Sequence, residues 1–210
     1  MPSSADEPRI AGVVLAGGLS RRMGGGDKAL KLLGGRTILD RVIARAVPQV
    51  DPLALNANGD PGRFAGTGLA VIPDSVEGFP GPLAGVLAGL EWARERGSTH
   101  VASFACDAPF LPDDLVSRLW QAIEENGAEI ASARSDGREH PVFALWPVAL
   151  ADALRTALVE EGVRKVDVWT ARYRLAHAAF STAPVDPFFN VNRPEDIEAA
   201  EAALNPRAER

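Results

Sequence analysis

The sequence predicts an α/β protein with three layers, in which helices cover both faces of an open, mostly parallel sheet. The first observation is that short apolar runs alternate with helical patterns along the first 127 residues. The second is that glycine or polar residues directly follow several of these runs, as they do where buried parallel strands end. The third is the composition of the 210-residue chain, since 46% hydrophobic and 24% charged residues are typical of a globular protein with a core. Together these features are typical of a Rossmann-like fold.

The first half of the chain contains the more regular patterns. Strands are expected where apolar runs match the length of buried strands, at residues 13–15, 53–56, 69–72 and 101–105. Helices are expected where apolar residues recur at helical spacing, from Thr37 to about Val47, from Pro82 to about Leu90, and from about Pro112 to Ile123. The last of these is expected to carry Asp113 and Asp114 in its first turn, where acidic residues favour the helix dipole.

The second half is less regular. It predicts strands at 129–133 and 142–146, a helix at 147–161, a loop with a short strand at 184–191, and a closing helix at 194–204. Residues 163–173 are compatible with either a helix or a strand. No internal repeat and no linker divides the chain, so a single domain is expected.

Four residues stand directly after predicted strands: Gly17, Asn56, Asp74 and Asp107. Ligands of open α/β sheets bind at the carboxyl ends of the strands. We therefore expect these residues to lie at one edge of the sheet and to form the functional site.

The segment after the first strand has the composition of a phosphate-binding loop. Gly17 and Gly18 are followed within ten residues by three more glycines, Arg22 and Lys28. Glycines let backbone N–H groups approach an anion closely, and basic side chains supply charge. The loop is neither a Walker loop, because Asp27 precedes Lys28, nor a dinucleotide fingerprint, because its later glycines are too far from the strand. The alternative is a flexible basic surface loop.

Charge and cysteine content exclude several classes of protein. A net charge of −6 argues against a general nucleic-acid or anionic membrane surface. No apolar run approaches the ~20 residues that span a bilayer, and the start of the chain has no apolar signal region. The single cysteine, Cys106, excludes an internal disulfide. We expect a cytoplasmic protein.

Residues 15–28 read Leu-Ala-Gly-Gly-x3-Arg-Met-Gly-Gly-x-Asp-Lys. This spacing resembles the signature loop of nucleotidyltransferases, and its ending is most similar to the molybdenum cofactor guanylyltransferase family. The resemblance continues in Asn56-Ala-Asn, in Pro80-Gly-Pro-Leu-Ala-Gly, in His140-Pro and in Phe189-x-Asn-Val-Asn-x-Pro-Glu-Asp, and so spans about residues 10–204. It implies a nucleotide-diphospho-sugar transferase-like fold over 1–210, with a nucleotide-binding half at about 9–127 and an acceptor-binding half at about 128–205.

The resemblance also implies an activity: transfer of GMP from GTP to the terminal phosphate of molybdopterin, with release of pyrophosphate. Mg²⁺ is the implied cofactor, with Asp107 as its ligand, since Mg²⁺ prefers one or two carboxylates together with phosphate oxygens. The implied catalytic residues are Arg22, Lys28 and Asp107. The implied nucleotide-binding residues are Leu15, Ala16, Gly17, Gly18, Lys28, Asn56, Asp74, Gly85 and Asp107, and the implied acceptor-binding residues are His140, Asn190 and Asn192. Transient contacts with cofactor-insertion proteins and molybdoenzymes would follow, without nucleic acid or membrane as partners.

Each of these residues also has a purely structural interpretation. Asp107, Asp74 and Asn56 are suited to turns after strands, and a lone histidine such as His140 is often structural. Asn192 is a good helix N-cap, with Glu195 at capping-box spacing. Functional alternatives are a related cytidylyl- or sugar-phosphate nucleotidyltransferase, or a non-catalytic protein of this fold that binds GTP or a pterin.

Overall fold

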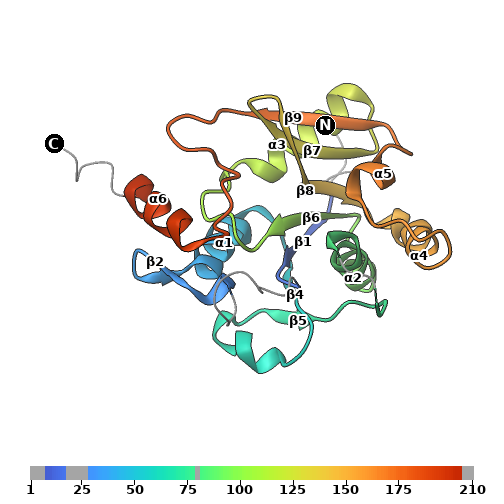
Figure 1. Cartoon of the computed structure of the whole chain (residues 1–210). Coiled ribbons are helices and arrows are strands. Elements are labelled where there is room, and N and C mark those ends of the chain that lie inside the picture. Colours follow the sequence, from blue (N-terminus) through green and yellow to red (C-terminus); the bar gives the residue numbers. More distant parts are fainter. Residues whose placement is uncertain (1–7, 18–27, 79–80, 205–210) are drawn as a thin grey trace.

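The computed structural model describes residues 8–17, 28–78 and 81–204, and their main feature is a seven-stranded sheet (Figure 1). Its strand order is β5-β4-β1-β6-β8-β7-β9. The strands are β1 (Ile10–Leu15), β4 (Leu53–Asn56), β5 (Ala70–Ile72), β6 (His100–Ala105), β7 (Ile130–Ser135), β8 (Arg138–Pro147) and β9 (Leu175–Phe180). Within this sheet every strand pairing is parallel except those of β8 with its two neighbours. The prediction of an open, mostly parallel α/β sheet is confirmed.

Helices cover both faces of this sheet and complete three layers (Figure 1). One face packs against α1 (Ile38–Ala46) and α3 (Leu115–Asn126), and the other against α2 (Pro82–Arg94), α4 (Ala151–Val159) and α5 (Val166–Thr170). Because side chains alternate along a strand, Val14 of β1 joins the first core and Val13 the second. Both residues are fully buried, which explains why β1 is an uninterrupted apolar run.

A smaller unit lies beside the main sheet. The short strands β2 (Leu32–Leu33) and β3 (Arg36–Thr37) form an antiparallel pair, and the last helix, α6 (Pro194–Leu204), packs beside them (Figure 1). Short 3-10 helices cover Lys28–Leu30, Val47–Gln49, Pro61–Thr67 and Val148–Leu150. Thr37, where the helix was expected to begin, caps α1, with its side chain accepting a hydrogen bond from the backbone N–H of Asp40.

Three expectations for secondary structure were wrong. The helix expected from Pro112 begins at Leu115, so Asp113 and Asp114 precede it instead of lying in its first turn. The helix expected at 147–161 is a 3-10 turn followed by a shorter α-helix. The segment 184–191 contains no strand.

Two further elements differ from the sequence patterns. Strands β7 and β8 extend through most of the segment that was expected to separate them, because Asp136 and Gly137 both have positive φ and form a two-residue hairpin turn. Strand β9 was not expected, since its sequence is rich in alanine and contains no β-branched residue. The segment 163–173, which was ambiguous, contains the short helix α5.

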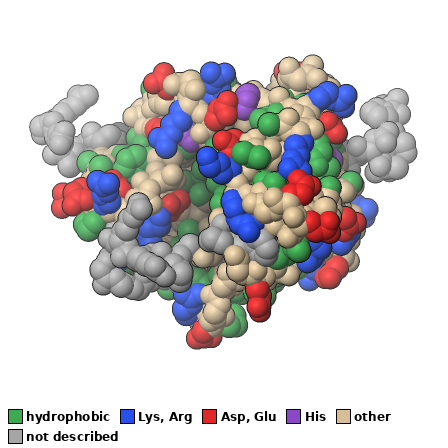
Figure 2. Space-filling model, turned by 45° about the vertical axis from the view of Figure 1, so that its right-hand side comes forward, with side chains coloured by type: hydrophobic (Ala, Val, Ile, Leu, Met, Phe, Trp, Pro, Cys, Tyr) green, Lys and Arg blue, Asp and Glu red, His purple; other side chains and the backbone are tan. Residues whose placement is uncertain are grey.

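The surface is of mixed charge on the face seen in Figure 2, where basic and acidic side chains are interspersed, in keeping with a formal net charge of −6. Among the described helices, none has the length and apolar character required to cross a membrane.

Candidate active site

The four strand-end residues lie at one edge of the sheet. Strands β5, β4, β1 and β6 are neighbours and run in parallel, so their carboxyl ends carry Asp74, Asn56, Gly17 and Asp107 side by side. Along the chain, β1 is followed by strands on one side of it, and β6 then pairs with its other side. Such a change of direction is the position at which α/β proteins bind their ligands. Gly18 and Arg22 lie outside the described residues.

Lys28 is the centre of an ionic cluster at this edge of the sheet. Its Nζ donates to Asp107 Oδ2 at 2.6 Å and to Asn192 Oδ1 at 2.6 Å. The side chains of Lys28 and Asp107 are 17% and 16% exposed, so both are shielded from water but reachable from it. The backbone N–H of Val191 donates to the carbonyl of Asp107 at 2.9 Å. The cluster thus joins the loop after β1, the end of β6 and the segment before α6.

The contacts of Asp107 and Asn192 bear on the structural interpretation of each residue. Asp107 lies in a turn after β6, as its structural interpretation requires, and its side chain pairs with Lys28. Asn192 was interpreted as a possible N-cap, and that interpretation was wrong. The backbone N–H groups of Asn192 and Arg193 are instead capped by Asp196, whose Oδ2 accepts at 2.7 and 2.8 Å. The Asn192 side chain instead contacts Lys28.

A second cluster lies at the ends of β4 and β5. Asn56 is 2% exposed, and its Nδ2 donates to the carbonyl of Ile72 at 3.2 Å and to Asp74 Oδ1 at 2.9 Å. Asn58 donates to Asp74 Oδ2 at 2.7 Å, and its Oδ1 accepts from the Asp74 backbone N–H at 2.9 Å. Asn58 was not among the predicted site residues, although its spacing of two from Asn56 was the signal that could have identified it. The Asp74 carboxylate is held by two side-chain amides.

Two glycines permit this arrangement. A Cβ on Gly85, in the first turns of α2, would lie 2.3 Å from Asn56 Oδ1 and 2.9 Å from Leu15 Cδ2. A Cβ on Gly17 would lie 3.4 Å from Asn56 Oδ1, which is an ordinary contact. Gly85 therefore lets α2 pack directly against Asn56. Ala16, which is 7% exposed, precedes Gly17 in the same turn.

His140 lies at the same edge of the sheet, at the start of β8, but inside the protein. It is 8% exposed, its Nε2 is 2.7 Å from Ser135 Oγ, and its ring stacks on Phe188 with a centroid distance of 4.5 Å. Asp186 Oδ1 accepts from Ser135 Oγ at 3.3 Å and from the Phe188 backbone N–H at 3.0 Å. Burial lowers the pKa of His140, against a raising effect of Asp186 and with a further lowering effect of Arg138. These contacts anchor the segment that leads to Asn190.

The residues around Asp107 fit a divalent metal ion. Asn190 Oδ1 is buried and has no hydrogen-bond partner among the described residues, and the next residue, Val191, is hydrogen-bonded to Asp107. Within the described ranges, no group of three or more His, Cys, Asp or Glu side chains could hold a metal. Mg²⁺ needs no such group, because it retains waters and takes phosphate oxygens in addition to one or two carboxylates. One carboxylate with a nearby amide oxygen agrees with that preference.

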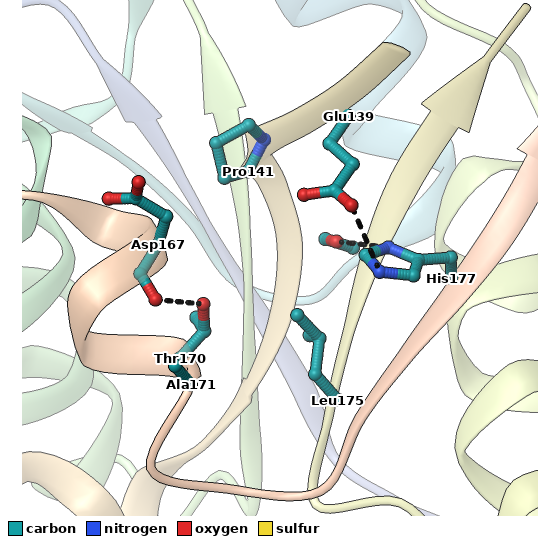
Figure 3. A pocket seen from close by; sticks show the side chains of 8 residues that line it. Glu139, Pro141, Asp167, Thr170, Ala171, Leu175 and His177 are labelled. Carbon is teal, nitrogen blue, oxygen red and sulfur yellow. Dashed lines mark hydrogen bonds and ion pairs between the residues drawn. The ribbon is translucent and has the colours of Figure 1, made fainter. Parts of the chain in front are cut away.

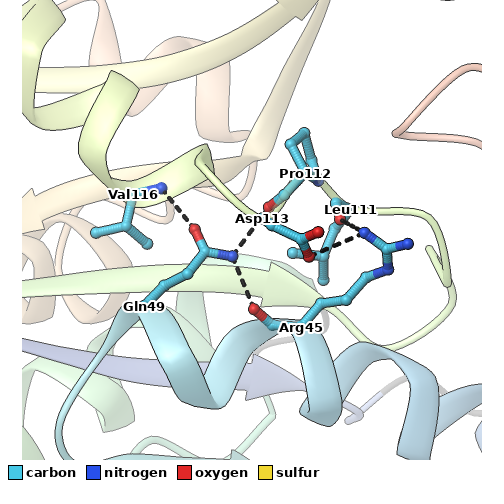
Figure 4. Close-up of polar contacts among 6 residues, drawn as sticks. All are labelled: Arg45, Gln49, Leu111, Pro112, Asp113 and Val116. Atoms are coloured by element: carbon cyan, nitrogen blue, oxygen red, sulfur yellow. Dashed lines mark hydrogen bonds and ion pairs between the residues drawn. The ribbon is translucent and has the colours of Figure 1, made fainter.

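The loop that carries Asp107 is fixed to α1 by a network that the sequence patterns did not reveal (Figure 4). Gln49 Nε2 donates to the carbonyls of Arg45 and Pro112 at 2.8 and 2.9 Å, and its Oε1 accepts from the Val116 backbone N–H at 3.0 Å. The guanidinium of Arg45 donates to the carbonyl of Leu111 at 3.1 Å. Gln49 thereby caps the first turn of α3, which has no side-chain cap of its own.

The chain is similar to known proteins over nearly its whole length. A model of the MobA-like NTP transferase domain matches residues 12–195. A molybdenum cofactor guanylyltransferase of Rhodopseudomonas palustris is 58% identical over 199 residues, which cover 94% of this chain and 95% of the relative. One of Nitrobacter hamburgensis is 57% identical over 202 residues, covering 94% and 97%.

Solved structures share the fold. The crystal structure of molybdopterin-guanine dinucleotide biosynthesis protein A from Archaeoglobus fulgidus superposes with a TM-score of 0.72 at 23% identity, covering 93% of this chain and 99% of that one. A Mycobacterium tuberculosis protein in complex with manganese superposes with a TM-score of 0.65 at 20% identity, with the same coverage. On the extent of the sequence matches, the chain belongs to the MobA-like NTP transferase family, in which it is similar over nearly its whole length to molybdenum cofactor guanylyltransferases.

Proposed function

We propose that the protein transfers GMP from GTP to the terminal phosphate of molybdopterin, forming molybdopterin guanine dinucleotide and pyrophosphate. The observation that carries the proposal is the cluster of Lys28, Asp107 and Asn192 at the carboxyl edge of the sheet. Phosphoryl chemistry needs such a cluster, because charge on the reacting phosphates must be neutralised and the reactants must be aligned. The names of the relatives select the substrates.

The reaction needs little from the protein in acid–base terms. The acceptor phosphate is a monoester whose second pKa is near ~6, so it is largely dianionic at neutral pH and is itself the nucleophile. Its oxygen attacks the α-phosphorus of GTP, and the bond to the leaving pyrophosphate breaks. No proton has to be removed from the nucleophile, so no general base is required. Catalysis then rests on positioning and on charge neutralisation.

Lys28 is the proposed cationic group for this neutralisation, together with Arg22 of the same loop. A lysine beside the triphosphate opposes the negative charge that grows on the leaving group. Asp107 is the proposed ligand of Mg²⁺, with Asn190 and Asn192 beside it. When bound, the metal would supply Lewis-acid stabilisation of the phosphate charge. The related Mycobacterium tuberculosis protein in complex with manganese supports a divalent ion.

The nucleoside is proposed to lie over the ends of β1, β4 and β5. Leu15 to Gly18 would offer backbone groups to the base, and Asp74 and Asn56 would orient the nucleoside from a network that holds both side chains rigidly. Gly85 would keep the first turns of α2 close to it. The acceptor is proposed to lie on the other side of Asp107 and to be bound by Asn190 and Asn192. His140 is proposed to assist from its buried position, through the segment around Phe188. As a molybdenum cofactor enzyme, the protein would work in the cytoplasm and meet cofactor-insertion proteins and molybdoenzymes.

The test is pyrophosphate release with Mg²⁺, molybdopterin and each of the four nucleoside triphosphates. Wild type is expected to prefer GTP, and Asp107→Ala to lower turnover by at least about 100-fold, a barrier rise of ~2.7 kcal/mol. Asp113→Ala is the matched control, because this aspartate lies in the same loop with its side chain 79% exposed and paired with Arg45. A preference for CTP would favour the cytidylyl alternative. Near-wild-type turnover of Asp107→Ala would remove Asp107 as the metal ligand.

A further inference from the structure

A separate pocket of about 200 Å³ lies on the α5 side of the sheet, within the half proposed to bind the acceptor (Figure 3). Strands β7, β8 and β9 form its floor, and α5 with the residue after it forms the opposite wall. Figure 3 shows Glu139 and His177 turned toward each other on one side of the pocket, with Asp167 and Thr170 on the other. None of the roles proposed above uses these side chains.

One side of the pocket presents a carboxylate beside a histidine. His177 Nδ1 is 3.0 Å from Ser132 Oγ, and its Nε2 is 3.5 Å from Glu139 Oε1. Ser132 is thus hydrogen-bonded to one ring nitrogen of His177, and the other ring nitrogen faces the Glu139 carboxylate. The second oxygen of Glu139 accepts no hydrogen bond from a described residue, and the side chain is 55% exposed. Ser132 is 2% exposed, so its hydroxyl is suited to orienting His177. It is too buried to serve as a nucleophile.

The rest of the lining is mixed, because Asp167 and Thr170 are polar and the other side chains are apolar. Pro141 lies on the same strand as Glu139, Ala171 directly follows α5, and Leu175 begins β9. A narrow space with apolar side chains and the Glu139 carboxylate on one wall suits a flat heteroaromatic ring that carries N–H donors on one edge. A pterin is such a ring, because its 2-amino group and adjacent N3–H point the same way and match the two oxygens of a carboxylate.

We propose that this pocket binds the pterin end of the acceptor, with the Glu139 carboxylate accepting hydrogen bonds from the 2-amino and N3–H groups. The proposal rests on the proposed function and adds the residue that would recognise the acceptor. His177 and Ser132 are positioning residues in it, because they act through Glu139.

The strand register places the pocket within reach of Asp107. Ser132 of β7 pairs with Ala144 of β8, which in turn pairs with Ser103 of β6. Ser132 is thus level with Ser103, four positions before Asp107 in the chain. Neighbouring strands are about 4.8 Å apart and each residue advances about 3.3 Å, so Asp107 lies roughly 10 Å sideways and about 13 Å further along the sheet from Ser132. Glu139, which pairs with Arg134, lies one strand closer to β6 and two residues nearer to the edge that carries Asp107. The proposal therefore places the donor edge of the pterin at Glu139 and requires the phosphate arm to extend from the pocket toward Asp107.

The direct test uses 6-hydroxymethylpterin as the probe and its fluorescence as the readout. Wild type is expected to bind it, and Glu139→Gln to bind it about tenfold or more weakly, because a hydrogen bond to a charged partner is lost. The 2,4-dioxo analogue lumazine, which presents an oxygen in place of the 2-amino group, should bind poorly to both. Glu160→Gln, an exposed carboxylate outside the pocket, is the matched control and should bind the pterin like wild type. Equal pterin binding by Glu139→Gln and wild type would overturn the assignment.

Guanine has the same donor edge as a pterin, so competition must separate the two. GMP should leave the bound pterin in place, and displacement of the pterin by GMP would show that the probe occupies the nucleotide site instead. In the complete reaction, Glu139→Gln should raise the KM for molybdopterin about tenfold while the KM for GTP stays the same. Pyrophosphate release by wild type is measured alongside. If wild type transfers GMP and the variant keeps its KM for molybdopterin, the pocket assignment fails and the proposed function stands.

Discussion

Lys28 joins side chains that lie 79 and 164 residues away in the sequence, Asp107 and Asn192. Lys28→Ala should lower kcat/KM for GTP by at least about 100-fold. The variant loses the positive charge that neutralises the negative charge growing on the leaving pyrophosphate and that also balances the Asp107 carboxylate. Lys28→Arg should recover only part of the activity, since a planar fork cannot replace a compact ammonium. The measurement is steady-state kinetics with GTP together with GTP binding. A Lys28→Ala protein with unchanged affinity and rate would contradict the role of this residue.

Gly85 provides a residue-scale test of packing at the site. Gly85→Ala should lower the free energy of unfolding by about 1–3 kcal/mol and raise the KM for GTP, because its Cβ would displace Asn56 from Asp74. Gly17→Ala is the control for stability, since its Cβ would meet Asn56 at an ordinary 3.4 Å. Chemical denaturation of both variants measures the difference. If the two variants are equally stable, the close contact of α2 with Asn56 is not the constraint.

At the scale of elements, Gln49 connects the end of α1 to the start of α3. Gln49→Ala should lower the free energy of unfolding by about 1–3 kcal/mol, because it leaves the Val116 N–H and the Pro112 carbonyl without their partner. Turnover should fall as well, since the same loop carries Asp107. Gln121→Ala is the matched control, because this glutamine is exposed on α3 and contacts only Glu125 among the described residues, so a change within about 0.5 kcal/mol is expected. Denaturant unfolding of both variants decides the matter, and equal stabilities would refute the bridging role of Gln49.

At the scale of the whole molecule, burial couples stability to pH. Burial lowers the pKa of His140 and of His100 below the ordinary value of about 6.5. Between the folded pKa and about 6.5, the unfolded chain binds more protons than the folded one, so the free energy of unfolding falls as the pH is lowered through this window. Denaturant unfolding at pH 7.5 and pH 5.5 should show this loss. A variant with both His100→Gln and His140→Gln should show a smaller loss, and an unchanged pH dependence would rule out these two histidines as its source.

The sequence by itself determined the fold class, most of the elements and the edge of the sheet at which four candidate residues meet. Apolar periodicity places strands such as 53–56 and helices such as the one from Pro82 because each depends on residues close together in the chain. The rule that ligands meet the carboxyl ends of parallel strands then predicted that Gly17, Asn56, Asp74 and Asp107 would share one edge, and the sheet order brings them there. The roles of these residues, and of Gly18 and Arg22, remain predictions.

Only the tertiary structure decided what depends on residues far apart in the chain. Asn192 has the local pattern of a helix cap, yet its side chain contacts Lys28 and Asp196 makes the cap. The cap of α3 comes from Gln49, 67 residues before Val116, and no local pattern contains it. Strand β9 is a strand because it pairs with β7 at the edge of the sheet and buries Ala176 and Ala178, although its alanines have little strand propensity. Local sequence encodes propensity and periodicity, whereas the partner of a polar side chain is selected by the packing of the completed sheet.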